Sequence, residues 1–345
     1  MKKSLLALAA LTAFAGAASA QSSVTLFGVV DLAATQVEGD FDRSLMTTDG
    51  NSSSRLGFRG VEDLGGGLKA GFWLEGAIAA DNGVTAGGQT WQRRSTISLM
   101  GGFGEVRLGR DYTPTFWNWT TFDPFGTVGV GAATNLGLEV ATIATGGSYG
   151  TLVRADNTFG YFLPSGLGGF YGQAMVSLGE NVAGNKYYGG RLGWASGPFN
   201  VAAAYGQTEV TLGDMDGSNW NVAGSWNLGM VLLSGFYGMI EVDNNRFEQE
   251  NWFVAARVPF GAMTFKASYG SVDRSRAPVG VARGDADMIA VGLQYDLSKR
   301  TAIYGTYSQI DNDGTRFRVF GGTNAPTVGA GVDSTGYQVG VRHSF

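Results

Sequence analysis

The chain has 345 residues, of which 56 are glycine and none is cysteine, and its formal net charge is −5 at pH 7. Without cysteine there are no disulfides, thiolate zinc sites or cysteine nucleophiles. The glycines lack the period of three that collagen requires, and 44% apolar residues exclude a disordered chain. The light, acidic charge offers no basic patch for nucleic acid, so we expect no nucleic-acid partner.

The first twenty residues, MKKSLLALAALTAFAGAASA, have the parts of a secretory signal peptide: two lysines, an apolar segment and the small residues Ala18-Ser19-Ala20. We predict cleavage after Ala20, which gives a signal peptide at 1–20 and a mature domain at 21–345. The alternative is an uncleaved anchor, but the apolar segment is shorter than the about 20 residues of a spanning helix. Further uncharged stretches are broken by glycine and proline, so we expect no membrane-spanning helix in the mature chain.

Apolar and polar residues alternate along the mature chain, which is typical of half-buried strands and not of helices. Clear examples are the stretches 23–33 (SVTLFGVVDLA), 68–75 (LKAGFWLE) and 287–297 (DMIAVGLQYDL). Seven short, glycine-rich connections, from 63–67 to 297–300, alternate with eight longer polar ones, from 36–53 to 311–334. These fifteen connections join sixteen strands.

Two soluble folds compete with a barrel. A propeller would repeat a blade motif, which is missing, and a pair of sandwiches would not need every long loop on one side. An even number of strands of about ten residues, with short turns at one end and long loops at the other, is typical of a transmembrane β-barrel. Because unpaired backbone groups are costly in hydrocarbon, the barrel must close. We therefore predict an all-β fold, a 16-stranded antiparallel transmembrane β-barrel.

Several stretches resemble the trimeric general (diffusion) porins of Gram-negative outer membranes. They include SRLGFRGVEDLGGGLKAGFWLE at 54–75, GGFGEVRLGRDYTP at 101–114 and the terminal GYQVGVRHSF at 336–345. The likeness covers about residues 21–345. It implies a homotrimer in the lipids of the outer membrane and passive diffusion of ions and small hydrophilic solutes. It also implies that the loop after the fifth strand folds into the lumen and narrows it.

The sequence agrees with an inward loop. The connection after the predicted fifth strand, Glu105–Tyr112, spans about 113–150 and is the longest in the chain. It has no Lys or Arg, and its only acids are Asp123 and Glu139. An external loop would carry more charge, so we predict a constriction loop inside the barrel. The alternative is a loop that covers the trimer surface.

The polar members of each alternation are expected to face the lumen. An arginine on the lipid face at mid-depth would cost about 2–4 kcal/mol, so mid-strand arginines should point inward. The predicted lumenal arginines are Arg55, Arg59, Arg94, Arg107 and Arg154. For any one of them the alternative is a solvated rim position or an ion pair within the wall. Arg93 and Arg110 have the opposite parity and are not included.

By resemblance, Arg55, Arg94 and Arg154 match the family's cluster on the wall that faces the inward loop, with Asp123 and Glu139 opposite. Such an arrangement sets up a field across the pore, which orients dipolar solutes. Because basic residues outnumber acidic ones at this level, we predict a mild preference for anions.

The chain is not expected to be an enzyme or to need a cofactor. Its single histidine, His343, falls on the predicted lipid face, where it cannot serve a catalytic triad or a zinc site. The DMDG and DNDG sequences at 214–217 and 311–314 lack full calcium-loop spacing and are read as turns, which leaves loop-bound calcium open. The alternative function is a substrate-specific channel, or a binding or receptor barrel that uses its loops.

The chain ends within a predicted strand, in which Tyr337 and Phe345 face lipid. This strand must pair with the first strand, around residues 23–31, to close the barrel. By resemblance, the terminal Phe345, with aromatic residues such as Tyr337 at alternate positions before it, is the signal that the barrel assembly machinery recognises.

Overall fold

A computed structural model of the protein describes residues 23–85, 88–137, 149–211, 215–243, 246–278, 280–320 and 326–345. The predicted signal peptide, residues 1–20, lies outside these residues and stays a prediction. No helix in the described ranges is long and apolar enough to cross a membrane.

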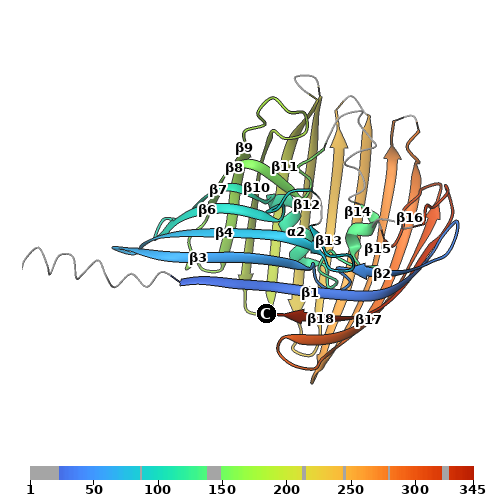
Figure 1. The fold of residues 1–345 in the computed structure, drawn as a ribbon. Coiled ribbons are helices and arrows are strands. Elements are labelled where there is room, and N and C mark those ends of the chain that lie inside the picture. Colours follow the sequence, from blue (N-terminus) through green and yellow to red (C-terminus); the bar gives the residue numbers. More distant parts are fainter. Residues whose placement is uncertain are drawn as a thin grey trace, which may run out of the picture.

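The described residues form one antiparallel sheet of eighteen strand segments (Figure 1). In chain order these are β1 (Ser23–Glu38), β2 (Arg43–Thr48), β3 (Arg55–Gly65), β4 (Leu68–Ala79), β5 (Val84–Thr85), β6 (Arg94–Gly101), β7 (Gly104–Tyr112), β8 (Arg154–Phe162), β9 (Phe170–Ser177), β10 (Tyr187–Ser196), β11 (Phe199–Thr211), β12 (Met215–Asn227), β13 (Leu232–Val242), β14 (Phe247–Phe260), β15 (Met263–Arg276), β16 (Gly284–Asp296), β17 (Thr301–Asp313) and β18 (Ser334–Ser344). Two helical segments, α2 (Pro114–Phe122) and the 3-10 turn η1 (Ala133–Leu136), lie between β7 and β8.

Two of the eighteen segments, β2 and β5, do not add a separate strand to the barrel wall. The first half of β1 pairs with β3 and its second half with β2, so β2 and β3 act as one strand interrupted at 49–54. The two-residue β5 pairs only with the end of β4. The wall is therefore a closed barrel of sixteen strands, which confirms the predicted fold class.

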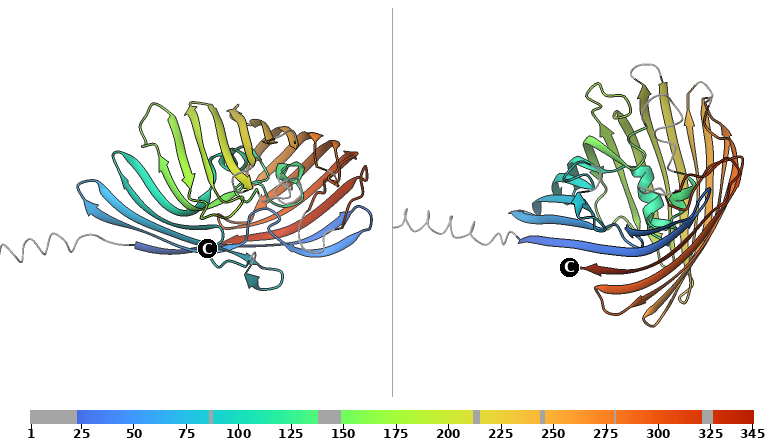
Figure 2. Two further views of the ribbon diagram at one scale, coloured as in Figure 1. Left: turned by 90° about the horizontal axis from the view of Figure 1, so that it is seen from above. Right: turned by 45° about the vertical axis from the view of Figure 1, so that its right-hand side comes forward.

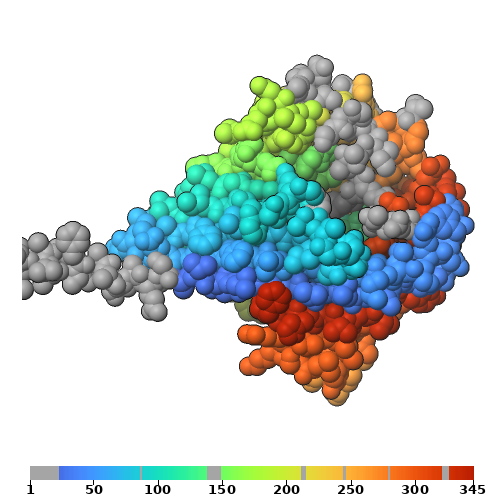
Figure 3. All heavy atoms as spheres, in the orientation of Figure 1, coloured from blue at the N-terminus to red at the C-terminus, as the bar shows by residue number. Residues whose placement is uncertain are grey.

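The barrel closes between its first and last strands. β1 and β18 pair from Val29↔Ser344 to Glu38↔Thr335, and they lie side by side in Figure 3 (blue and red). Beyond β18, Phe345 and Gly28 exchange two backbone hydrogen bonds of 3.1 Å. The Phe345 ring covers Gly28, where a Cβ atom would lie 2.3 Å from the ring. The terminal residue is therefore held by the first strand.

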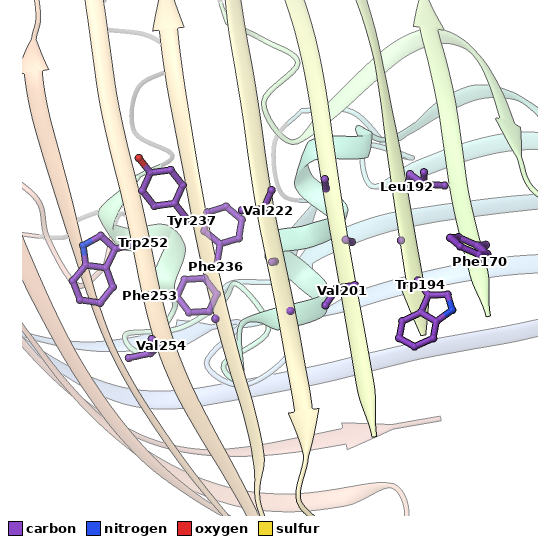
Figure 4. A pocket seen from close by; sticks show the side chains of 16 residues that line it. Phe170, Leu192, Trp194, Val201, Val222, Phe236, Tyr237, Trp252, Phe253 and Val254 are labelled. Atoms are coloured by element: carbon purple, nitrogen blue, oxygen red, sulfur yellow. The ribbon is translucent and has the colours of Figure 1, made fainter. Parts of the chain in front are cut away.

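The outer face of the wall is apolar. Large side chains at alternate positions project from it, and Leu26, Ile97 and Val339 are 54%, 60% and 68% exposed. In Figure 4, Val201, Val222 and Val254 border a shallow groove of 740 Å³ across β9–β14. These valines are exposed on the outer face, so the groove belongs to the outer surface and not to the lumen.

The inner face is not polar all round. Several inward positions of β11–β14, among them Ala202, Ala223, Phe236 and Phe253, are small or apolar and pack against α2. Trp119 of α2 lies 4.1 Å from Phe236 between ring centroids, and Phe236 stacks on Phe253. The expectation that polar residues face the lumen is therefore wrong for these positions, which the connection after β7 covers, whereas Asn221 and Asn251 of the same strands are polar and also face inward.

Several strands continue beyond their predicted ends. β2 lies in the stretch 36–53 that we expected to be loop, and β17 runs to Asp313, into the connection expected at 311–334. Apart from Leu45 and Met46 of β2, these extensions are polar, so the apolar alternation by which we found the strands stops before the backbone pairing does.

Candidate functional site

The connection between β7 and β8 enters the barrel (Figure 2), and we call its residues 113–137 the inner loop. Side chains of the wall bind its backbone. Asn221 of β12 donates a hydrogen bond to the carbonyl of Thr115 (3.1 Å), and Ser234 of β13 donates one to the carbonyl of Phe122 (2.8 Å). Asn251 of β14 contacts the carbonyl of Leu136 in the same way. The inner loop is thus fixed to the wall formed by β11–β14.

Asp123 lies at the end of α2 and is only 5% exposed. Its carboxylate accepts hydrogen bonds from the backbone N–H groups of Phe125 (2.9 Å), Thr127 (3.0 Å) and Ala133 (3.1 Å). Burial raises the pKa of Asp123 to about 6, although the three N–H groups favour the charged form. Asp123 therefore organises the turn after α2 and does not present its charge to the lumen. The other predicted loop acid, Glu139, lies outside the described residues.

The opposite wall carries the predicted arginines together with carboxylates. Glu75 of β4 pairs with Arg93 (2.7 Å) and lies 3.8 Å from Arg55 of β3. Asp111 of β7 lies 3.9 Å from Arg94 of β6. We call the group Arg55, Arg93, Arg94, Arg107 and Arg154, with Glu75, Glu105 and Asp111, the arginine wall. Its arginines outnumber its carboxylates.

Arg154 joins this cluster to both ends of the inner loop. It is the first residue of β8, and Tyr112 is the last residue of β7. Arg154 donates hydrogen bonds of 2.9 Å to the Tyr112 hydroxyl and to the carbonyl of Arg93, and its guanidinium lies 4.3 Å from the Tyr112 ring centroid. The two strand ends that start and finish the loop are thereby clamped together.

Arg107 and Arg59 lie nearer the short-turn end of the barrel and differ in their partners. Arg107 pairs with Glu105 (2.8 Å) and with Asp111, and it is buried. Arg59 is exposed, and its guanidinium lies 5.0 Å from the centroid of Trp73. Arg107 is thus an ion-paired part of the wall, as our alternative allowed, whereas Arg59 faces open space.

Sequence parity missed Arg93. This residue precedes β6, whose alternation begins at Arg94, so strand parity does not apply to it. Its backbone N–H donates to the carbonyl of Glu75 and its side chain pairs with the Glu75 carboxylate. Arg110, excluded for the same reason, pairs with Asp156 at 2.6 Å. An acidic residue at a lumenal position of β4, Glu75, was the sequence signal that could have indicated a basic partner such as Arg93.

A cavity of 370 Å³ separates the arginine wall from the inner loop. Arg55, Arg93 and Arg94 line one side of it, and Trp117 and Thr127 of the loop line the other. The described loop residues that border it are uncharged. Of the two acids expected across the cavity, Asp123 is held in the turn after α2 and Glu139 stays untested, while two other carboxylates, Glu75 and Asp111, lie among the arginines.

The described residues hold no group of three or more His, Cys, Asp or Glu side chains placed to bind a metal ion. In the DNDG turn, the Asn312 side chain donates to the carbonyls of Phe317 and Val332 and accepts from Thr315. It thus forms a local turn. Asp214 of the DMDG sequence lies outside the described residues.

Comparison with known proteins matches this barrel and its inner loop to one family. The model of the Gram-negative porin family matches residues 7–315. The chain is 38% identical to outer membrane porin protein 32 of Delftia acidovorans over the full length of both chains. It is 32% identical to an outer membrane porin of Bordetella pertussis over 68% of each.

Solved structures agree. An anion-selective porin from Comamonas acidovorans superposes with a TM-score of 0.84 at 36% identity, covering 94% of this chain and 100% of that one. OmpT of Vibrio cholerae, at 18% identity, shares the fold with a TM-score of 0.70, covering 95% and 99%. These relatives are outer-membrane proteins and the porins among them are channels, not enzymes. The chain belongs to the Gram-negative porin family of the outer membrane.

Proposed function

We propose that this outer-membrane porin, a channel for passive diffusion, is narrowed by its inner loop and mildly prefers anions. The observation that carries the proposal is the cavity between the inner loop and the arginine wall. Arginines outnumber carboxylates along one side, and the loop residues on the other side are uncharged. A narrow, wet passage with excess positive charge raises the local concentration of anions.

The Comamonas acidovorans relative is described as anion-selective, which supports the same preference here. In this proposal the excess positive charge of the arginine wall sets the ion selectivity. The described residues do not place acids opposite bases across the cavity, so no transverse field contributes. The ion pairs of Glu75 and Asp111 reduce that excess, so the preference is mild.

The assembly in this proposal is a homotrimer, with the short-turn end toward the periplasm and the apolar outer face against lipid. Phe345 and Tyr337 have exposed side chains on the outer face, at 42% and 46%, where the assembly machinery can reach them before insertion. Solute transport uses no cofactor. Ions and small hydrophilic solutes are the transported class.

The test replaces Arg55, which lines this cavity, with Gln and measures the ratio of chloride to potassium permeability in planar bilayers. A charge about 5 Å from a passing ion contributes about 0.8 kcal/mol in water, so losing it should lower the ratio by about two- to fourfold. The matched control is Arg257→Gln on β14, an exposed arginine away from the arginine wall. Equal effects of the two substitutions would show that the arginine wall does not set selectivity.

A further inference from the structure

A second cavity lies in the lumenal wall toward the short-turn end, and Arg94, Arg107 and Glu105 of the arginine wall lie on its rim. Its volume is 370 Å³, within the range of small-molecule sites. It is bordered by inward positions of β1, β3, β4, β6 and β7, and it shares Trp73 and Arg94 with the cavity beside the inner loop. A solute that leaves the inner loop toward the short turns therefore meets this cavity next.

At the floor of the cavity the wall has no side chain at Gly71, and the Met100 side-chain tip lies close over it. Gly71 pairs with Val61 on one side and with Ser98 on the other. A Cβ atom at Gly71 would lie 2.9 Å from the Met100 side-chain tip and 3.8 Å from a Val61 methyl group. The floor is thus bare backbone bordered by apolar side chains, which is unusual for a wet lumen.

Guanidinium groups surround this apolar floor. Arg59 lies 5.0 Å and Arg94 4.5 Å from the Trp73 ring centroid. Trp73 is itself fixed, because its indole N–H donates a 3.0 Å hydrogen bond to Glu75. The two guanidiniums are therefore held in place before any solute arrives, which lowers the entropic cost of binding.

Arg59 is the group that remains available to a ligand. Arg94 lies 3.9 Å from Asp111, and Arg107, the third arginine on the rim, pairs with Glu105 and Asp111. Within the described part of the chain, no carboxylate lies at ion-pair distance from the exposed Arg59, whose contacts are the rings of Phe27 and Trp73. A guanidinium without a carboxylate partner can form a bidentate pair with one from solution.

We infer that this cavity is a binding station for small carboxylates with an apolar body. Arg59 binds the carboxylate, and the floor between Val61 and Met100 receives the apolar body. Chloride or acetate has the charge but buries little or no apolar surface, so it gains only part of this interaction. The inference deepens the proposed anion preference and rests on it, because the same excess of positive charge draws the carboxylate into the lumen.

The test uses the full-length trimer in planar bilayers with benzoate as the probe and acetate as the control anion, at fixed chloride and ionic strength. We expect benzoate to reduce chloride conductance in a saturable way, with half-block at about tenfold lower concentration than acetate. Arg59→Gln should raise the half-blocking benzoate concentration about tenfold. Gly71→Val, which fills the floor without changing charge, should weaken the block by benzoate and leave acetate unchanged.

Arg257→Gln removes an exposed arginine from β14, outside this cavity, and should leave the benzoate block unchanged. Equal block by benzoate and acetate, or equal losses in the Arg59 and Arg257 variants, would overturn the inference. Ion selectivity is measured first, without benzoate. A channel without anion preference contradicts the proposed function, whereas an anion-preferring channel that benzoate does not block contradicts only the binding station.

Discussion

Replacing Asp123 with Ala should loosen the inner loop and leave the barrel intact. The carboxylate is the acceptor for three backbone N–H groups that are held at 2.9 to 3.1 Å inside the packed turn after α2. A buried donor left without an acceptor costs about 2 kcal/mol, so three cost about 6 kcal/mol. Burial raises the pKa of Asp123 from 3.8 to about 6, which corresponds to a cost of about 3 kcal/mol for keeping the carboxylate charged in the folded loop at neutral pH. Replacing Asp123 with Ala removes this cost. The net loss of loop stability is about 3 kcal/mol.

The inner loop loses stability because the hydrogen bonds of Asp123 are made within it, whereas the barrel strands keep their pairing. In single-channel recordings, Asp123→Ala should show larger current fluctuations and a higher mean conductance than the wild type. Strand content and the thermal unfolding of the barrel, followed by circular dichroism, should be unchanged. The matched control is Asp63→Ala at the β3–β4 turn, where the carboxylate is exposed and accepts one bond from the Gly65 N–H. A quiet Asp123→Ala channel with wild-type conductance would refute this role.

The same residue predicts a pH dependence. Because the folded-state pKa of Asp123 is raised, the folded loop binds more protons than the unfolded one between pH 3.8 and about 6, so acidification across this window stabilises the loop. Current fluctuations should therefore fall from pH 7 to pH 5 in the wild type and not in Asp123→Asn, and a rise in the wild type would contradict the assignment. Deleting Phe345 should strongly reduce the amount of inserted trimer, measured in outer-membrane fractions, while the channels that do insert keep their conductance. Normal insertion of this deletion would show that the terminal residue is not needed for assembly.

The sequence predicted the architecture because period-two patterning and turn spacing are local signals. The alternation found the sixteen-stranded wall and the pairing of the first and last strands. It did not predict the apolar patch on the lumenal side of β11–β14, since that patch depends on what covers it. Phe236 and Phe253 face inward because Trp119 of the inner loop packs on them, and this contact joins residues more than a hundred positions apart.

The sequence likewise predicted only part of the functional site. Parity placed Arg55 and Arg94 in the lumen, but it cannot tell which lumenal charges are already paired. Asp123 looked like a pore charge because it is one of two acids in the loop, whereas the structure uses it as an acceptor for the backbone. Arg93 lies just outside a strand, where parity has no meaning. In each case the deciding factor is a three-dimensional contact that strand parity does not encode.

The reversal potential of the wild-type channel in a potassium chloride gradient tests the central claim most directly. Excess arginine over carboxylate beside the inner loop predicts a potential whose sign shows chloride to be more permeant than potassium, by a modest ratio. The preference should weaken as the salt concentration rises, because screening shortens the range of the wall's charge. A potential that shows clear cation selectivity would contradict the account.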